Sequence, residues 1–144
     1  MKRFFNISLA TIILASALAI GAQAQSSSAQ RVIATIPFSF TAGHKTLPAG
    51  KYTITVLNPS SDRKILQIRS MNGRSSVIVQ TTGVIGDATE NAKLVFDRYG
   101  DTYVFARAQL AGDSTTLAAL RSKSDQKQWM AKGSKKSVVV VAAE

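Results

Sequence analysis

The sequence has no cysteine, a single histidine and few acidic residues. Its 144 residues carry 18 Lys and Arg against 8 Asp and Glu, a formal net charge of +10 at pH 7. Without cysteine the chain has no disulfide, no thiol nucleophile and no cysteine-ligated zinc or iron–sulfur site. The hydrophobic core alone must therefore hold the fold, and about 120 residues can bury roughly two-thirds of their unfolded surface.

The excess of positive charge favours anionic partners. A composition of 45% hydrophobic and 18% charged residues is typical of one globular domain. A basic balance suits phospholipid, lipopolysaccharide, acidic polysaccharide or nucleic acid. Because the chain carries an export signal, described next, we expect no nucleic acid. The alternative is that positive charge only keeps a small protein soluble.

Residues 1–24 have the three parts of a secretory signal peptide. Two basic residues precede an apolar run over residues 4–20, and Ala22 and Ala24 supply the small side chains that signal peptidase recognises. The run is slightly shorter than the about 20 residues of a membrane span, although an uncleaved anchor is the alternative. We expect an exported protein of the periplasm or cell surface, without a transmembrane span after cleavage.

After a short polar tether over residues 25–30, residues 31–144 form the single predicted domain. Apolar residues recur there at every second position, which is the period of strands with one buried face. The sequence predicts an all-β fold, an antiparallel β-sandwich or partly open barrel of about seven short strands. The predicted strands are residues 31–40, 51–56, 64–70, 75–82, 93–98, 102–110 and 137–141.

The connections follow from turn-forming residues. Asn72-Gly73 predicts one hairpin, and residues 99–101 predict a second. Residues 41–50 and 83–91 are predicted to be loops, the first because of its glycines and its proline. Pro37 cannot donate a ladder hydrogen bond, so its strand should lie at an edge or contain a bulge.

Residues 112–133 lack a strand period. Asp113 or Ser114 is a suitable N-cap, and the segment that follows predicts a short helix through Arg121. Leu117 and Leu120 would lie on one side of that helix.

Three segments resemble a family of small exported β-rich proteins that is frequent in acidobacteria. They are residues 36–40 (IPFSF), 47–54 (LPAGKYTI) and 93–101 (KLVFDRYGD). The resemblance covers most of the mature chain and implies an exported β domain. It carries over no functional residues.

Candidates for enzyme chemistry are few. His44 could act as a general base, but the sequence has no Gly-x-Ser-x-Gly motif that would supply a nucleophilic serine. The carboxylate pairs Asp87 with Glu90 and Asp97 with Asp101 lie in a predicted loop and a predicted turn, where Asp is common. Neither a metal-ligand spacing nor a phosphate-binding glycine loop is present. We therefore expect no catalytic residue, no metal site and no cofactor.

Basic residues and one tryptophan gather near the C-terminus. Ammonium and guanidinium groups attract an anionic lipid or glycan, and an indole can anchor at the interface. The alternative is a solvated connection whose tryptophan packs back onto the domain. The candidate surface-binding residues are Arg121, Lys123, Lys127, Trp129, Lys132, Lys135 and Lys136.

The leading hypothesis is an exported, non-catalytic β domain that binds anionic envelope lipid or glycan through this basic region. A second hypothesis is a structural or self-assembling surface protein that uses edge-strand pairing. The β-branched run over residues 138–141 could pair with another subunit, although pairing within its own sheet is the simpler expectation. A secreted carbohydrate-active enzyme is the third hypothesis.

Overall fold

The computed structural model describes residues 30–142, which form ten strands and one helix. The predicted signal peptide, with Ala22 and Ala24, and most of the predicted tether lie outside the described residues. The elements in chain order are β1 (Arg31–Ile36), β2 (Phe40–Ala42), β3 (Lys45–Leu47), β4 (Gly50–Val56), β5 (Ile65–Ser70), β6 (Ser76–Ile85), β7 (Lys93–Tyr99), β8 (Thr102–Gln109), β9 (Thr115–Ala119), α1 (Lys123–Met130) and β10 (Lys135–Val141).

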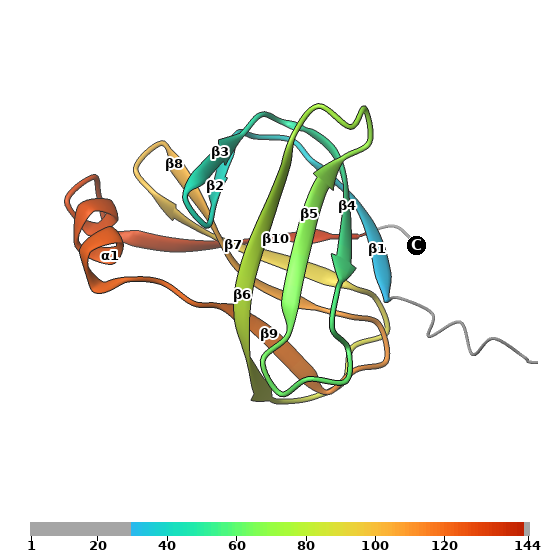
Figure 1. The fold of residues 1–144 in the computed structure, drawn as a ribbon. Helices are drawn as coiled ribbons and strands as arrows, with labels where there is room; N and C mark the ends of the chain where they lie inside the picture. Colours follow the sequence, from blue (N-terminus) through green and yellow to red (C-terminus); the bar gives the residue numbers. More distant parts are fainter. Residues whose placement is uncertain (1–29, 143–144) are drawn as a thin grey trace, which may run out of the picture.

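The strands form one large, mixed and mostly antiparallel open sheet. Its order is β1-β4-β5-β6-β9-β8-β2-β3, while β7 pairs with β8 on that path and with β10. Strand β6 joins the two halves, because its first part pairs with β5 and its second part with β9. In Figure 1, β4, β5 and β6 cross in front of β7 and β10. The described strands number ten rather than about seven.

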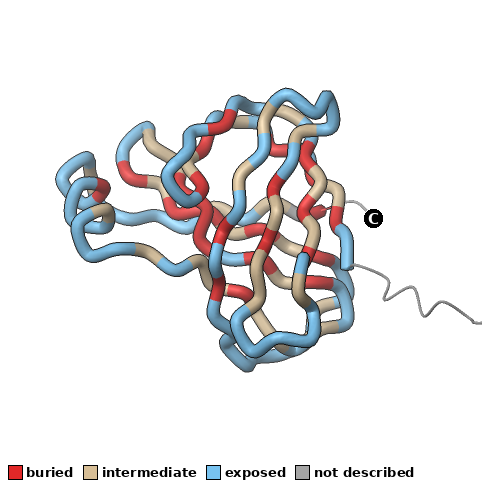
Figure 2. The backbone as a smooth tube through the Cα atoms, viewed as in Figure 1, coloured by how far each residue is buried: buried red, intermediate tan, exposed pale blue. Residues whose placement is uncertain are grey.

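The core lies between the two halves of the sheet. Alternating residues of β4 and β5 point inward, and Ile54 and Leu66 are 1% and 0% exposed. Phe96 of β7 contributes from the other half, with its ring edge-on to Phe40 at 5.2 Å and to Phe105 at 5.8 Å. Figure 2 shows buried residues alternating with exposed ones along the central strands. The period of two therefore predicted the inward faces correctly.

Both predicted hairpins are confirmed. The β5–β6 turn places Gly73 at φ 73°, and the β7–β8 turn places Gly100 at φ 61°, a region that favours glycine. The valine-rich run is part of β10, which pairs with β7 of the same chain. Pairing within its own sheet is therefore confirmed for this run.

Two predicted loops are partly wrong. Residues 41–50 contain a small hairpin of β2 and β3, whose turn has Gly43 at φ 57°. Strand β6 runs on to Ile85 instead of ending before the second loop. Strands of three residues are too short to show a period, which is why the sequence pattern missed the hairpin. The first strand likewise ends at Ile36, because Pro37 interrupts the ladder.

The predicted helix through Arg121 is wrong. Its residues form β9, where Leu117 is 1% exposed between Ala108 of β8 and Gly83 of β6. Tertiary pairing on both sides decides this segment, and its local propensity does not. The helix begins two residues later, at Lys123. No helix within residues 30–142 has the length and apolarity needed to cross a membrane.

Candidate functional site

Helix α1 carries part of the predicted basic region. Ser122 is its N-cap, and the Ser122 hydroxyl accepts a hydrogen bond from the Asp125 backbone N–H at 3.1 Å. The helix has eight residues, of which only Trp129 is buried. Figure 1 shows α1 projecting from one side of the sheet. Because two turns of helix are not stable alone, contacts of Trp129 with the sheet must hold it in place.

Arg121 and Trp129 form the anchor of the helix. The Arg121 guanidinium donates to the Asp97 carboxylate at 2.6 Å and to the Phe105 carbonyl at 2.8 Å. It also lies 5.3 Å from the centre of the Trp129 ring, within cation–π range. Trp129 also stacks with Tyr99, at 6.2 Å between ring centres. The indole is only 9% exposed.

This placement changes the role of two of the seven predicted binding residues. Arg121 is internal and paired with Asp97, and Trp129 packs back onto the domain as the alternative interpretation proposed. Neither is free to contact an extended surface. The other five remain exposed, and within residues 30–142 none of them forms an ion pair. We call these five the lysine surface: Lys123, Lys127, Lys132, Lys135 and Lys136.

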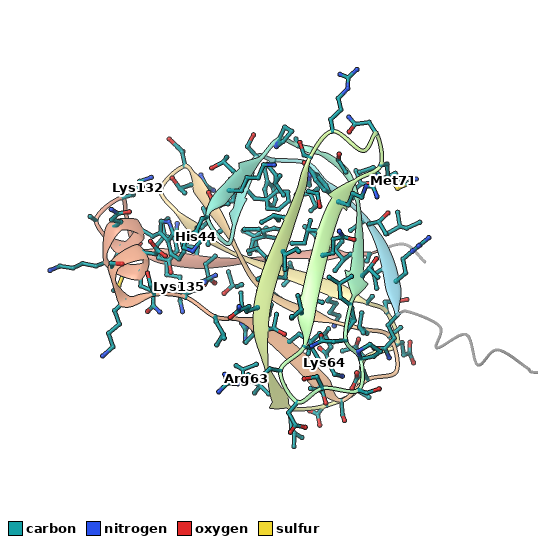
Figure 3. The ribbon with its side chains drawn as sticks, in the orientation of Figure 1. His44, Arg63, Lys64, Met71, Lys132 and Lys135 are labelled. Carbon is teal, nitrogen blue, oxygen red and sulfur yellow. The ribbon has the colours of Figure 1, made fainter. Side chains whose placement is uncertain are left out.

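An exposed apolar side chain, Met130, lies in the same part of the chain as the lysine surface. Lys123 and Lys127 are four residues apart, which puts them on the same side of α1. Met130 follows three residues after Lys127 and is 68% exposed. In Figure 3, Lys132 and Lys135 lie beside the helix. An exposed thioether therefore follows Lys123 and Lys127 on the same side of α1.

The chain that follows α1 is fixed to the β7–β8 turn by backbone packing. A Cβ on Gly100 would lie 2.7 Å from the Lys132 carbonyl oxygen, so the two segments are in close contact. Lys136 then lies opposite Arg98 in the β10–β7 register. A hollow of about 280 Å³ lies here, and both of these cations line it. Asp101 is 3.8 Å from Arg98 and neutralises part of this charge.

The candidates for enzyme chemistry are dispersed. His44 is exposed in the β2–β3 turn, at a cavity of about 190 Å³ that Asp125 and Trp129 also line. Asp97 is bound to Arg121, so it does not form a carboxylate pair with Asp101. Across residues 30–142, no three His, Cys, Asp or Glu side chains are grouped to hold a metal ion.

Comparisons with protein-family models, with curated proteins and with solved structures gave no significant match. The resemblance to the exported acidobacterial family therefore stays a prediction. No residue of this chain takes a role from a relative.

Proposed function

We propose that the protein is a non-catalytic, exported β domain that binds anionic envelope lipid through the lysine surface. The observation that carries this proposal is the set of five exposed lysines, without ion pairs among the described residues, on α1 and on the segment that joins it to the start of β10. Acidic groups are scarce there: Asp125 is the single carboxylate within residues 121–142, and Asp101, in the hollow beside Lys136, is paired with Arg98. The charge is thus available to an external anion.

Electrostatic attraction and insertion would act together at this surface. Each lysine near an anionic leaflet contributes about 1 kcal/mol, and the attraction falls off within a Debye length of about 10 Å. Met130 can bury its exposed thioether among the lipid headgroups while the ammonium groups remain at the phosphates. The Trp129 anchor holds α1 in position before binding, which lowers the entropy lost on binding.

The scaffold suits this role. We infer that the open sheet folds on itself as a sandwich or partly open barrel, and so gives α1 a rigid base. The predicted signal peptide would deliver the domain to the periplasm or the cell surface, where anionic lipid and glycan are abundant. The resemblance to small exported β-rich proteins supports the same location.

A second candidate function is self-assembly through strand β10. Among the described strands, β10 hydrogen-bonds with β7 alone and lies at an edge of the open sheet. An unpaired edge is a template for another strand. Sedimentation equilibrium across a concentration series distinguishes this candidate, since assembly through β10 predicts a mass that rises with protein concentration. A constant monomer mass would remove it.

The test of lipid binding is co-sedimentation with phosphatidylglycerol-containing vesicles across a salt series. Lys132→Gln with Lys135→Gln should weaken binding by roughly 2 kcal/mol, or about 30-fold. The matched control is Arg63→Gln with Lys64→Gln, which removes the same charge at the β4–β5 turn, well away from α1 in Figure 3.

The control variant should bind as the unchanged protein does, apart from a small general effect of net charge. Binding by the unchanged protein should also fall steeply as salt is added. Equal losses in the two variants would show that net charge alone drives association. Absence of binding at low salt would refute the proposal.

A further inference from the structure

The outward face of β1, β4 and β5 contains a polar groove. Its residues alternate with the buried ones of the same strands, so their side chains point away from the core. The groove has a volume of about 430 Å³. The strand residues that line it are Arg31, Thr53, Thr55, Gln67, Arg69 and Ser70, and the β5–β6 turn contributes residues 71–73 at one end.

The groove lies in a part of the chain that is almost free of carboxylates. Residues 30–86 contain seven Lys and Arg but a single acidic residue, Asp62. Strands β1, β4, β5 and β6 have no Asp or Glu. Within residues 30–142, neither Arg31 nor Arg69 is in an ion pair. Two guanidinium groups therefore face solvent without an internal counter-ion.

The groove is built on rigid elements. Arg31 and Arg69 come from β1 and β5, which flank β4. Arg31 is paired with Thr55 and Arg69 with Thr53, so their backbones are separated by two strand spacings and two residues along the strands, roughly 12 Å in all. Arg69 Nη2 lies against the turn, 3.6 Å from the position of a Cβ on Gly73. That turn is closed by a 2.6 Å hydrogen bond between the Ser70 and Asn72 side chains. The arrangement is therefore in place before a ligand arrives.

We propose that this groove binds a linear, carboxylated polysaccharide strand that crosses β1, β4 and β5. Each guanidinium can donate two parallel hydrogen bonds to a carboxylate of the glycan. The Thr55 hydroxyl and the Gln67 amide, which continue the row of side chains that begins at Arg31, can bond to sugar hydroxyls. None of the lining residues is aromatic, so charge rather than ring stacking provides the attraction.

The shape and lining of the groove favour a glycan over a membrane. A bilayer surface needs a projecting apolar group to insert, whereas the groove is hollow and its walls bear hydroxyl, amide and guanidinium groups. Met71, at its rim, is the exception, and in Figure 3 it lies on the far side of the sheet from α1. The glycan site is therefore separate from the lysine surface and does not depend on it.

The experiment is calorimetric titration of the full protein with oligogalacturonate and with its neutral methyl ester. Arg31→Gln with Arg69→Gln should weaken oligogalacturonate binding about tenfold or more. The matched control, Arg63→Gln with Arg107→Gln, removes the same charge from two exposed arginines elsewhere. It should change the affinity less than threefold, roughly the effect of screened charge. The methyl ester should not bind.

A conservative variant separates loss of the site from loss of the fold. Arg31→Lys with Arg69→Lys keeps the charge but removes the planar fork, so its affinity should fall between those of the other two proteins. Three outcomes would each overturn the proposal. These are failure of the unchanged protein to bind oligogalacturonate, equally tight binding of the methyl ester, and equal loss of affinity in the Gln variant and its control. A vesicle-binding assay distinguishes the groove from the lysine surface. Arg31→Gln with Arg69→Gln should reduce vesicle binding no more than the charge-matched control does.

Discussion

Replacing Arg121 by Met tests whether one ion pair holds α1 on the sheet. The Arg121 and Asp97 side chains are 14% and 8% exposed, with a 2.6 Å hydrogen bond between them. Removing one partner of a buried pair costs about 3–5 kcal/mol, and the partial exposure here favours the lower end. Methionine retains packing against Trp129, so we expect the free energy of unfolding to fall by about 3 kcal/mol, mainly because Asp97 is left uncompensated.

The second half of the test is a double-mutant cycle. Asp97→Leu with Arg121→Met replaces both charges by apolar groups. The free energy of unfolding of this double variant should lie within about 1 kcal/mol of that of the unchanged protein. A small remaining loss is expected because the Phe105 carbonyl no longer receives its 2.8 Å hydrogen bond from Arg121. The predicted coupling between the two sites is therefore at least about 1.5 kcal/mol.

The assay uses the only tryptophan in the chain. Urea unfolding followed by Trp129 fluorescence reports on α1, while far-ultraviolet circular dichroism reports on the sheet. For Arg121→Met we expect the fluorescence transition to occur at lower urea than the dichroism transition. A coupling below about 0.5 kcal/mol, the limit for independent sites, would show that the Arg121–Asp97 pair does not hold α1 on the sheet. So would fluorescence that is unchanged in both single variants.

Three further predictions concern the core, a turn and alkaline pH. Phe96→Ala, at a 0% exposed position, should lower the free energy of unfolding in urea by about 3–5 kcal/mol, whereas Val139→Ala should change it by about 0.5 kcal/mol. Gly100 and Gly112 both have positive φ angles, 61° and 72°. A Cβ at Gly100 would lie 2.7 Å from the Lys132 carbonyl oxygen, whereas a Cβ at Gly112 would meet open space. Thermal denaturation should show that Gly100→Ala lowers the free energy of unfolding by about 3 kcal/mol and Gly112→Ala by about 1 kcal/mol. Equal losses in the two variants would contradict the close packing at Gly100. Burial raises the pKa of Tyr52 above its ordinary 10.0. The folded state therefore keeps the phenol proton longer, and the associated stability is present below pH 10.0 and lost as pH rises toward the raised pKa. Tyr52→Phe should flatten this part of a stability-against-pH curve, and an unchanged curve would exclude the tyrosine as its cause.

Much of the fold was predictable because several strands alternate strictly. In residues 51–56 and 64–82 the inward positions are apolar except Thr81, so the period gives both the strand and its buried face. The Asn72-Gly73 pair predicts where the hairpin turns, and so the register of its strands, because few residues accept the backbone angles of such a turn. The strand β9 was missed because its burial requires pairing on both sides, with β8 just before it and with β6, which is about 30 residues earlier in the chain.

The candidate site was predictable only in part. Composition located the lysines but gave no indication that Arg121 would pair with Asp97, which is 24 residues earlier in the chain. Such a pair depends on β7 and the end of β9 lying close together. The groove had even less signal, since Arg31 and Arg69 are brought together by the pairing of β1 and β5 with β4.

The sequence by itself determined the β class of the domain, its positive charge, its lack of thiol chemistry and which residues of the regular strands face inward. These properties depend on composition or on the two-residue period, and both act locally along the chain. Tertiary structure decided which cations are free and which are internal, that Trp129 anchors α1 rather than facing solvent, and that two arginines share one groove. Those outcomes depend on contacts between elements that are far apart in the sequence, and a local sequence pattern does not predict such contacts.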